Sequence, residues 1–319
     1  MTEKLAETKI LFVTDLHGSE TYFLKVLSAA KSFNVNTLII SGDLTGKAIA
    51  PIVKIDENRY VTTFFGRDYR IGEDELPALE KDIRRVGYYY LLCSRKEYED
   101  FKADPQQIDR LFDKMMEDTV VNWIHKIEEV LPRDVRVIMN PGNDDSFVVD
   151  EALKRSLRSE YSIGRVMDLD DIHSMVSCEW VNPTPWNSPR ECSEQELEKK
   201  LRTEIGRVSE TSHLVCDFHT PPINTPLDSA PKLGKDLQPK MFLGQPVFEH
   251  VGSKAVRKVL EEFQPKLGLH GHIHESAGTC RIGKTTCVNP GSEYIEGIMH
   301  GYLLTLTPDK VDYQPIMGG

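Results

Sequence analysis

Short apolar runs recur along the chain and predict a buried β-sheet. Five of them show no alternation between polar and apolar positions, which is typical of strands covered on both faces. Apolar residues at helical spacing between Phe23 and Ala30 predict a helix after the first run, and Ser19 is suited to cap it. Strand, helix and strand then form a βαβ unit, in which ligands collect beyond the carboxyl ends of the strands. The five runs are 9–14, 37–40, 135–139, 213–216 and 266–269.

Longer periodic patterns predict further helices, and the C-terminal part of the chain returns to strand-like patterns. The helix that opens at Pro105 carries a stripe of apolar residues, which indicates core packing rather than a cofactor site. Residues 220–250 hold six prolines and little periodicity, which predicts an ordered loop or a lid. The predicted helices are 105–130, 193–208 and 253–263, and the predicted C-terminal strands are 285–288 and 302–306.

A different pattern occupies about residues 44–110, between the second and third buried runs. Apolar and aromatic residues at 52–55 and 60–65 flank Asp56-Glu-Asn58, which predicts a small hairpin. Because this segment interrupts the series of buried strands, we expect residues 1–319 to form one domain in which about residues 44–110 are inserted as a cap. The other elements expected in this segment are a charged helix at 73–85 and a strand at 88–92.

Composition and charge narrow the classes of function. The chain has 319 residues, is 39% hydrophobic and carries a net charge of −11. A net negative charge repels a phosphate backbone, so we expect no duplex nucleic acid as a partner. No run approaches the roughly 18 apolar residues of a membrane span, so we expect no membrane partner. Six cysteines without a CxxC pair, and an N-terminus without an apolar segment, predict reduced thiols in a cytoplasmic protein.

One match to a known motif is rejected because the residues on either side of it do not fit. Residues 278–285 fit the phosphate-loop pattern, with Gly278, Gly283, Lys284 and Thr285 in the required places. That motif needs a buried strand before it and a helix after it, so that backbone amides can hold the phosphates. Here the histidine-rich stretch at 270–274 precedes it and β-branched residues follow, which predicts a hairpin turn instead.

Each of the five buried runs ends in a turn that carries metal-capable side chains. A lone histidine is more often a surface or core residue, but His272 and His274 alternate in an extended stretch and so point to one side. Seven mixed nitrogen and oxygen ligands are too many for one transition metal. They suit two ions that share a carboxylate at a separation of roughly 3.5–4 Å. The candidate ligands are Asp15, His17, Asp43, Asn143, His219, His272 and His274.

The order of these blocks, Asp-x-His, Gly-Asp, Gly-Asn, His and Gly-His-x-His, resembles the calcineurin-like metallophosphoesterases. The blocks span residues 15–274, which is most of the chain. The resemblance implies an α/β fold, a four-layer αββα sandwich, with a dimetal centre at the ends of its sheets. His270 lies outside the motif and is expected in a supporting or core role. The resemblance implies that Asp15, His17 and His274 hold one ion, that Asn143, His219 and His272 hold the other, and that Asp43 bridges them.

The resemblance also implies a chemistry. A water that bridges two divalent ions becomes hydroxide near neutral pH, and the ions neutralise phosphate oxygens during displacement. We therefore expect a phosphodiesterase or phosphatase that acts on a small phosphorylated substrate, nucleotides included. Carboxylate and imidazole ligands suit Mn, Fe, Zn, Co or Ni. No Asp-Arg-Gly follows Asp43 and no tyrosine stands near it, so the chain looks more like the stand-alone prokaryotic phosphoesterases than like protein phosphatases or purple acid phosphatases.

One position departs from the family pattern. Where the family usually has Gly-Asn-His, this chain has Gly142-Asn143-Asp144. The family histidine is credited with protonating the leaving group or stabilising the transition state, and a carboxyl with a reference pKa of about 3.9 is a poor replacement as an acid. We therefore expect substrates with good leaving groups. Asp144 is either a catalytic residue or a residue that orients a ligand.

Two other classes of function compete with the hydrolase. The first is a non-catalytic metal-binding interaction module on the same fold, which would be expected to lose ligands, whereas all seven are present. The second is a nuclease that acts on short single strands, because the acidic net charge argues against a duplex.

Overall fold

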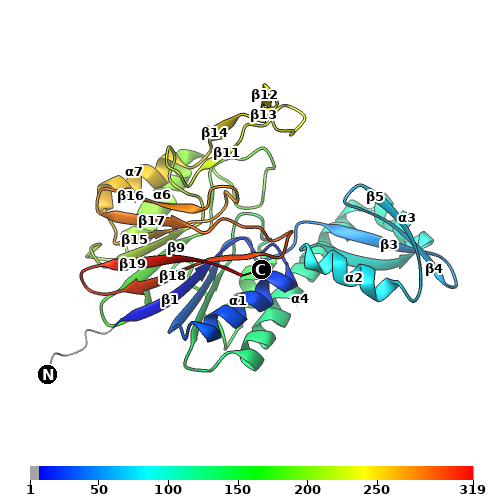
Figure 1. The fold of residues 1–319 in the computed structure, drawn as a ribbon, viewed down its shortest axis with the longest axis horizontal. Helices are drawn as coiled ribbons and strands as arrows, with labels where there is room; N and C mark the ends of the chain where they lie inside the picture. Colours follow the sequence, from blue (N-terminus) through cyan, green and yellow to red (C-terminus); the bar gives the residue numbers. More distant parts are fainter. Residues whose placement is uncertain (1–6, 319) are drawn as a thin grey trace.

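Two facing β-sheets form the centre of the molecule (Figure 1). The computed structural model describes residues 7–318; residues 1–6, on which the expectation about the N-terminus partly rests, lie outside this range. The first sheet has the order β19 (Val311–Gly318), β18 (Met299–Leu306), β1 (Thr8–Val13), β2 (Thr37–Ser41) and β7 (Arg136–Asn140). The second has the order β16 (Gly278–Ile282), β17 (Thr285–Asn289), β15 (Leu267–Leu269), β10 (Leu214–Phe218), β9 (Ser174–Cys178) and β8 (Met167–Asp168).

Helices cover the outer face of each sheet. The first sheet is covered by α1 (Glu20–Ser32), α4 (Pro105–Val130) and α5 (Val148–Lys154), and the second by α6 (Glu194–Ile205) and α7 (Lys254–Phe263). The order is helix, sheet, sheet and helix, which confirms the predicted four-layer sandwich.

Successive side chains of β1 point to opposite faces of its sheet, so this short strand contributes to two hydrophobic cores. On β1, Leu11 and Val13 face α1 and α4, whereas Ile10 and Phe12 face the second sheet. All four side chains are fully buried. Burying one such side chain stabilises the fold by about 1.5–3 kcal/mol, so an unbroken apolar run is favoured over an alternating one. A third core lies between the second sheet and helices α6 and α7.

The five predicted strands are confirmed as β1, β2, β7, β10 and β15. β1 runs parallel to β2, and β2 parallel to β7. In the second sheet β10 runs parallel to both β9 and β15. Because parallel strands end on the same edge, the turns that carry the candidate ligands are gathered there.

A separate four-stranded sheet lies to one side of the sandwich, at the right of Figure 1. It has a core of its own, in which Ile52, Tyr60 and Ile83 are buried. The predicted hairpin at 52–65 is confirmed, and α4 leads the chain back to the main core. The sheet has the order β5 (Arg67–Gly72), β4 (Arg59–Phe64), β3 (Ile49–Asp56) and β6 (Tyr89–Ser94), with helices α2 (Leu76–Arg85) and α3 (Arg95–Ala103).

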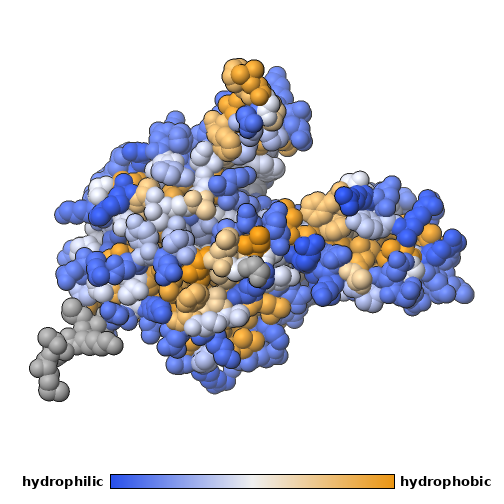
Figure 2. Space-filling model, in the orientation of Figure 1, coloured by the Kyte–Doolittle hydropathy of each residue, from blue (hydrophilic) through white to orange (hydrophobic). Residues whose placement is uncertain are grey.

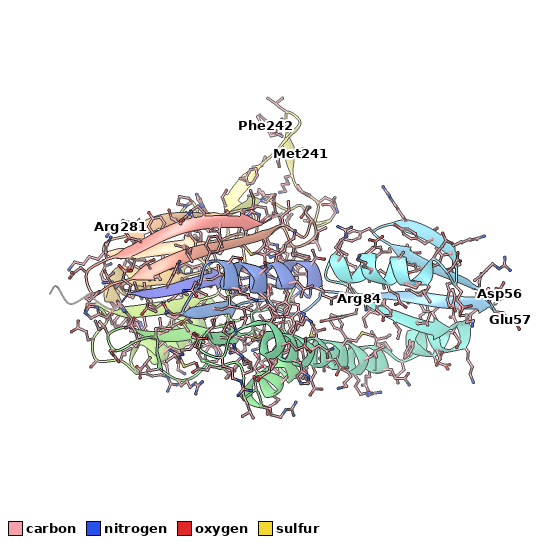
Figure 3. The ribbon with its side chains drawn as sticks, turned by 60° about the horizontal axis from the view of Figure 1, so that its bottom comes forward. Asp56, Glu57, Arg84, Met241, Phe242 and Arg281 are labelled. Atoms are coloured by element: carbon pink, nitrogen blue, oxygen red, sulfur yellow. The ribbon has the colours of Figure 1, made fainter. Side chains whose placement is uncertain are left out.

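Within residues 220–250, residues 229–250 project from the sandwich as a narrow arm (Figure 1), whereas Thr220, Leu227 and Asp228 are buried in the body of the molecule. Its base pairs β11 (Ser229–Pro231) with β14 (Phe248–His250), and its end pairs β12 (Met241–Phe242) with β13 (Gln245–Pro246). Figure 2 shows apolar atoms at the tip, and Figure 3 shows Met241 and Phe242 there, away from the sheets. Phe242 is 69% exposed and Leu243 88% exposed.

The hairpin predicted in place of a phosphate loop is confirmed. β16 and β17 are antiparallel neighbours joined at Gly283-Lys284, and no helix follows within the described residues. Cys280 and Cys287 face each other across this hairpin, and all six cysteines lie within the described residues as free thiols. Between residues 7 and 318, none of the helices combines the length and the apolar character that crossing a bilayer requires.

Candidate metal centre

The structure brings all seven predicted ligands to one edge of the sandwich. Metal-capable atoms of Asp15, His17 and His274 lie within 4.8 Å of one another, and so do those of Asp43, His219 and His272. The Oδ1 atom of Asn143 is 3.1 Å from the Nε2 atom of His219. His17 and His274, which are 257 positions apart in the chain, therefore face one small volume with the other donors.

The first group of donors has the spacing expected around a single ion. The Nε2 atoms of His17 and His274 are 3.0 Å apart, and the Oδ1 atom of Asp15 is 3.4 Å from His274 Nε2 and 3.9 Å from His17 Nε2. Ligands about 2.1 Å from a metal lie roughly 3–3.5 Å from one another. The separations of 3.0 and 3.4 Å lie in this range and the separation of 3.9 Å is somewhat longer, so the three donor atoms are close enough to surround one ion.

Asp43 faces both groups. Its Oδ2 atom is 3.7 Å from the Nε2 atom of His17, in the first group, and its Oδ1 atom is 3.5 Å from the Nε2 atom of His219, in the second. A carboxylate that turns one oxygen to each of two donor sets is placed as a bridging ligand would be. The donor set of carboxylates, imidazoles and one amide oxygen is suited to borderline divalent ions.

Four of the predicted ligands have an unusual backbone. Asp15, His17, Asp43 and His272 have positive φ values of 54°, 45°, 43° and 66°. L-residues rarely adopt this region, and such residues cluster at functional sites where surrounding structure holds them. Here the N–H of Asp15 donates to the carbonyl of Gly42, and the N–H of His17 donates to the carbonyl of Asp43. The two ligand-bearing turns therefore hold each other in place.

The glycines of the motifs allow these turns to approach closely. A Cβ atom on Gly142 would lie 2.2 Å from the backbone nitrogen of Asp43. A Cβ atom on Gly271 would lie 2.2 Å from Thr14 Oγ1 and 2.4 Å from Asp15 Oδ2. Glycine is therefore required for steric reasons in the Gly-Asn and Gly-His pairs, because any larger side chain would push the ligands apart.

Asp145 is a positioning residue that the sequence analysis did not single out. Its buried carboxylate accepts the backbone N–H groups of Leu44 (2.9 Å), Thr45 (2.9 Å) and Gly142 (2.8 Å). It therefore ties the turn after β2 to the turn after β7. The chain shows only an acidic residue next to Asp144, and its contacts with Leu44 and Thr45 appear only in the fold.

Asn143 is oriented by its own amide group. The Nδ2 atom donates to Asp144 Oδ1 and to Ser188 Oγ, both at 2.8 Å, and the Ser188 hydroxyl donates to Glu191 Oε1 at 2.7 Å. With the amide nitrogen engaged on the outer side, the Oδ1 atom faces His219. This is the orientation that a metal ligand needs.

The electrostatics show how strongly these groups act on one another. Burial raises the pKa of Asp43, but the charges of His219 and His17 outweigh burial and hold the pKa well below its usual value. Burial lowers the pKa of His219, but Asp43 and Asp15 outweigh it and raise the pKa to about 9. Burial lowers the pKa of His272 to about 4. The buried carboxylates therefore favour the binding of a positively charged group at this point.

Asp144 lies beside the cluster and forms an ion pair with Lys47. Burial and the charge of Asp43 raise the pKa of Asp144 to about 6, and Lys47 opposes them. The Nζ atom of Lys47 is 3.0 Å from Asp144 Oδ2. His270, by contrast, turns its Nδ1 atom to the carbonyl oxygen of Phe218 at 2.7 Å and is buried behind the cluster.

One curated relative shares a large part of the chain. It is an uncharacterized protein, MJ1162, from Methanocaldococcus jannaschii, 33% identical over 173 residues, which are 53% of this chain and 70% of the relative. At that identity and coverage the two proteins belong to one family. No protein-family model matches the chain.

Among solved structures, one crystal structure covers 97% of this chain and 99% of its own, with a TM-score of 0.59 and 16% identity, and so shares the fold. With this fold, the five blocks of the motif meet at one edge of the sandwich. The order of these blocks resembles that of the calcineurin-like metallophosphoesterases. Two more solved structures match the chain less well. They are TT1561 of Thermus thermophilus (TM-score 0.49, 11% identity, 97% and 99% of the two chains) and an archaeal phosphodiesterase (0.36, 13%, 98% and 100%).

Proposed function

We propose that the protein is a dimetal phosphoesterase that hydrolyses a phosphodiester, or a phosphomonoester with a good leaving group. The observation that carries the proposal is Asp43, which turns one oxygen to each of two donor groups. Asp15, His17 and His274 would hold one divalent ion, and Asn143, His219 and His272 the other. When bound, two such ions supply an activated water and neutralise charge on phosphate oxygens.

The residues of the chain position these components. Asp145 holds the Asp43 and Asn143 turns together, and Ser188 fixes the amide of Asn143. The backbone N–H of His272 donates to Asp15 Oδ2 at 3.0 Å, which ties the turn after β15 to the turn after β1. The donors are thus preorganised by hydrogen bonds outside the site, so binding requires little rearrangement.

The preference for good leaving groups follows from position 144. No imidazole stands there, and the carboxylate is engaged by Lys47. We therefore infer that Asp144, which is held by Lys47, gives the leaving group less general-acid assistance than an imidazole would. Aryl esters, diesters and pyrophosphates, including nucleotides, are the proposed substrate class. The Asp144→His variant should broaden activity toward alkyl esters.

Metal reconstitution followed by an ester screen tests this function. Protein loaded separately with Mn, Fe, Zn, Co or Ni is assayed against aryl mono- and diesters, with metal content measured in parallel. We expect about two ions per chain and turnover of aryl esters, and we expect Asn143→Ala to reduce both. Two bound ions without turnover of any ester would favour the non-catalytic module, and cleavage of short single-stranded oligonucleotides would favour the nuclease.

A further inference from the structure

Lys47 lies at the mouth of the candidate metal centre, in the loop that follows β2. Its Nζ atom is 3.0 Å from Asp144 Oδ2 and 6.0 Å from the centre of the Tyr294 ring. About 37% of its side chain is exposed, so a small anion that enters from solvent can reach it. The lysine is thus accessible and at the same time held beside the donor cluster.

The backbone that carries Lys47 is fixed on two sides. The carboxylate of Asp145 accepts the N–H of Leu44, and the N–H of Gly46 donates to the hydroxyl of Tyr89, both at 2.9 Å. Tyr89 belongs to β6 of the separate sheet, so the loop is clamped between the sandwich and that sheet. A fixed cation needs no reorganisation when charge develops on a substrate, which is the condition for strong electrostatic stabilisation.

Asp144 connects Lys47 to the cluster. Its backbone N–H donates to Asp43 Oδ1 at 2.9 Å, and its carboxylate lies within 4.8 Å of the metal-capable atoms of His17 and Asp43. This is the position where related metallophosphoesterases have a histidine that acts on the leaving group. A carboxylate supplies no positive charge, but the lysine that it holds does.

We propose that Lys47, positioned by Asp144, contacts the substrate phosphoester and stabilises the negative charge that develops on the leaving-group oxygen. The inference rests on the proposed phosphoester hydrolysis. The oxygen of the attacking water forms the new bond to phosphorus, and the bond from phosphorus to the leaving group breaks with its electron pair passing to the leaving oxygen. Lys47 stays protonated throughout, and the leaving oxygen takes its proton from solvent, so the proton lost by the attacking water is balanced.

A leaving-group series tests the role of Lys47. Lys47→Met removes the charge at similar length, and Lys47→Arg keeps it. For aryl phosphodiesters of increasing leaving-group pKa, we expect Lys47→Met to lower kcat/KM by about 10²-fold with the poorest leaving group and much less with the best. Lys47→Arg should stay within about tenfold of the wild type. Equal loss across the series, or no loss, would overturn the proposed role.

Binding of inorganic phosphate gives a readout that does not need turnover. In calorimetry on metal-loaded protein, we expect Lys47→Met to raise the Kd for orthophosphate about tenfold or more while metal content and Tm stay unchanged. Asp144→Asn, which keeps the lysine but loosens it, should have a smaller effect. Wild-type protein that hydrolyses esters but binds phosphate no better than Lys47→Met would overturn the inference and leave the function standing. If the protein takes up no metal and cleaves no ester, the proposed function is wrong. The difference in phosphate affinity between the wild type and Lys47→Met then still shows whether Lys47 contacts an anion.

Discussion

Gly271 shows how a residue without a side chain can be required for a metal centre. A Cβ at this position would lie 2.2 Å from Thr14 Oγ1 and 2.4 Å from Asp15 Oδ2, and the turn has no slack because the N–H of Gly271 donates to the carbonyl of His219. We expect Gly271→Ala to destabilise the protein by about 1–3 kcal/mol, as overpacking does, and to reduce metal uptake.

Gly278→Ala is the matched control for Gly271→Ala. A Cβ on Gly278 would meet its nearest neighbour, Leu227, at an ordinary 3.6 Å. Thermal melts and metal analysis of the two variants give the comparison. Gly271→Ala protein that melts and loads metal like Gly278→Ala would contradict the steric argument.

At the residue scale, the sequence identified the donors but not the residues that hold them. Asp15, His17 and His274 belong to local motifs that any reader of the chain can see, and the structure gathers them. Asp145 acts on Leu44, 101 positions away, through a backbone contact that leaves no pattern in the sequence. Lys47 is likewise an unremarkable lysine until the fold brings Asp144 to it. The metal-binding roles themselves stay predictions until an ion is measured.

Helices α1 and α4 meet at an aromatic stack in the core that covers the first sheet. Phe23 and Trp123 are parallel, with ring centres 4.3 Å apart, and both are buried. We expect Trp123→Ala to cost about 3–5 kcal/mol of unfolding free energy, because it removes a large side chain from a packed core. Phe242→Ala, at the exposed tip of the arm, should change stability by less than about 0.5 kcal/mol. Equal losses for the two variants in denaturant unfolding would contradict this account of the core.

At the scale of elements, the strands that could be predicted are those with an unbroken run of apolar residues. β1, β2, β7, β10 and β15 are buried on both faces and stand out. β9 was missed because Ser174 and Ser177 interrupt its apolar pattern, and Ser177 serves a polar cluster between the sheets, where Asn140 donates to it. β5 was missed because it is a charged edge strand, and β12 and β13 because each has two residues. One domain of residues 1–319 with a cap at about 44–110 stays a prediction.

Asp170 connects the two sheets at the end of the sandwich where β1 begins. It accepts a hydrogen bond from Thr8 Oγ1 and lies 2.9 Å from the Nδ1 atom of His173. Burial raises the pKa of Asp170, but the hydrogen bonds from Thr8 and His173 outweigh it and lower the pKa to about 2, against an ordinary 3.8. A lowered pKa stabilises the fold above pH 3.8, and this contribution is lost as the pH falls toward 2.

The Asp170→Asn variant tests that contribution in the whole molecule. We expect it to be less stable than the wild type at about pH 6, by about 1–2 kcal/mol, and the difference to shrink as the pH is lowered from about 4 to about 2. Glu57→Gln, at the exposed turn at the far end of the separate sheet (Figure 3), is the control and should show a small difference at every pH. A deficit of Asp170→Asn that is as large at the acid end of this range as near neutrality would contradict the assignment.

Because the donors come from both sheets, a bound ion would connect the two halves of the sandwich. We expect divalent metal at about 100 times its Kd to stabilise the fold by about 2.7 kcal/mol per ion, which raises Tm by several degrees. In Asp43→Asn the rise should fall to less than half, since both donor groups lose a carboxylate oxygen. Melting curves with metal and with chelator measure this, and equal shifts in both proteins would count against a bridging role for Asp43.

The position of β1 has a consequence for how the protein is made. β1 lies in the middle of its sheet, between β2, which follows it directly, and β18, which ends at Leu306. During translation β1 therefore emerges with one edge unpaired, and this edge stays unpaired until β18 has been synthesised. The candidate metal centre is likewise incomplete until His272 and His274 have been synthesised, because Asp15 and Asp43 come much earlier in the chain. We therefore expect nascent chains that contain β1 but not yet β18 to expose an unpaired strand edge, which favours binding by chaperones.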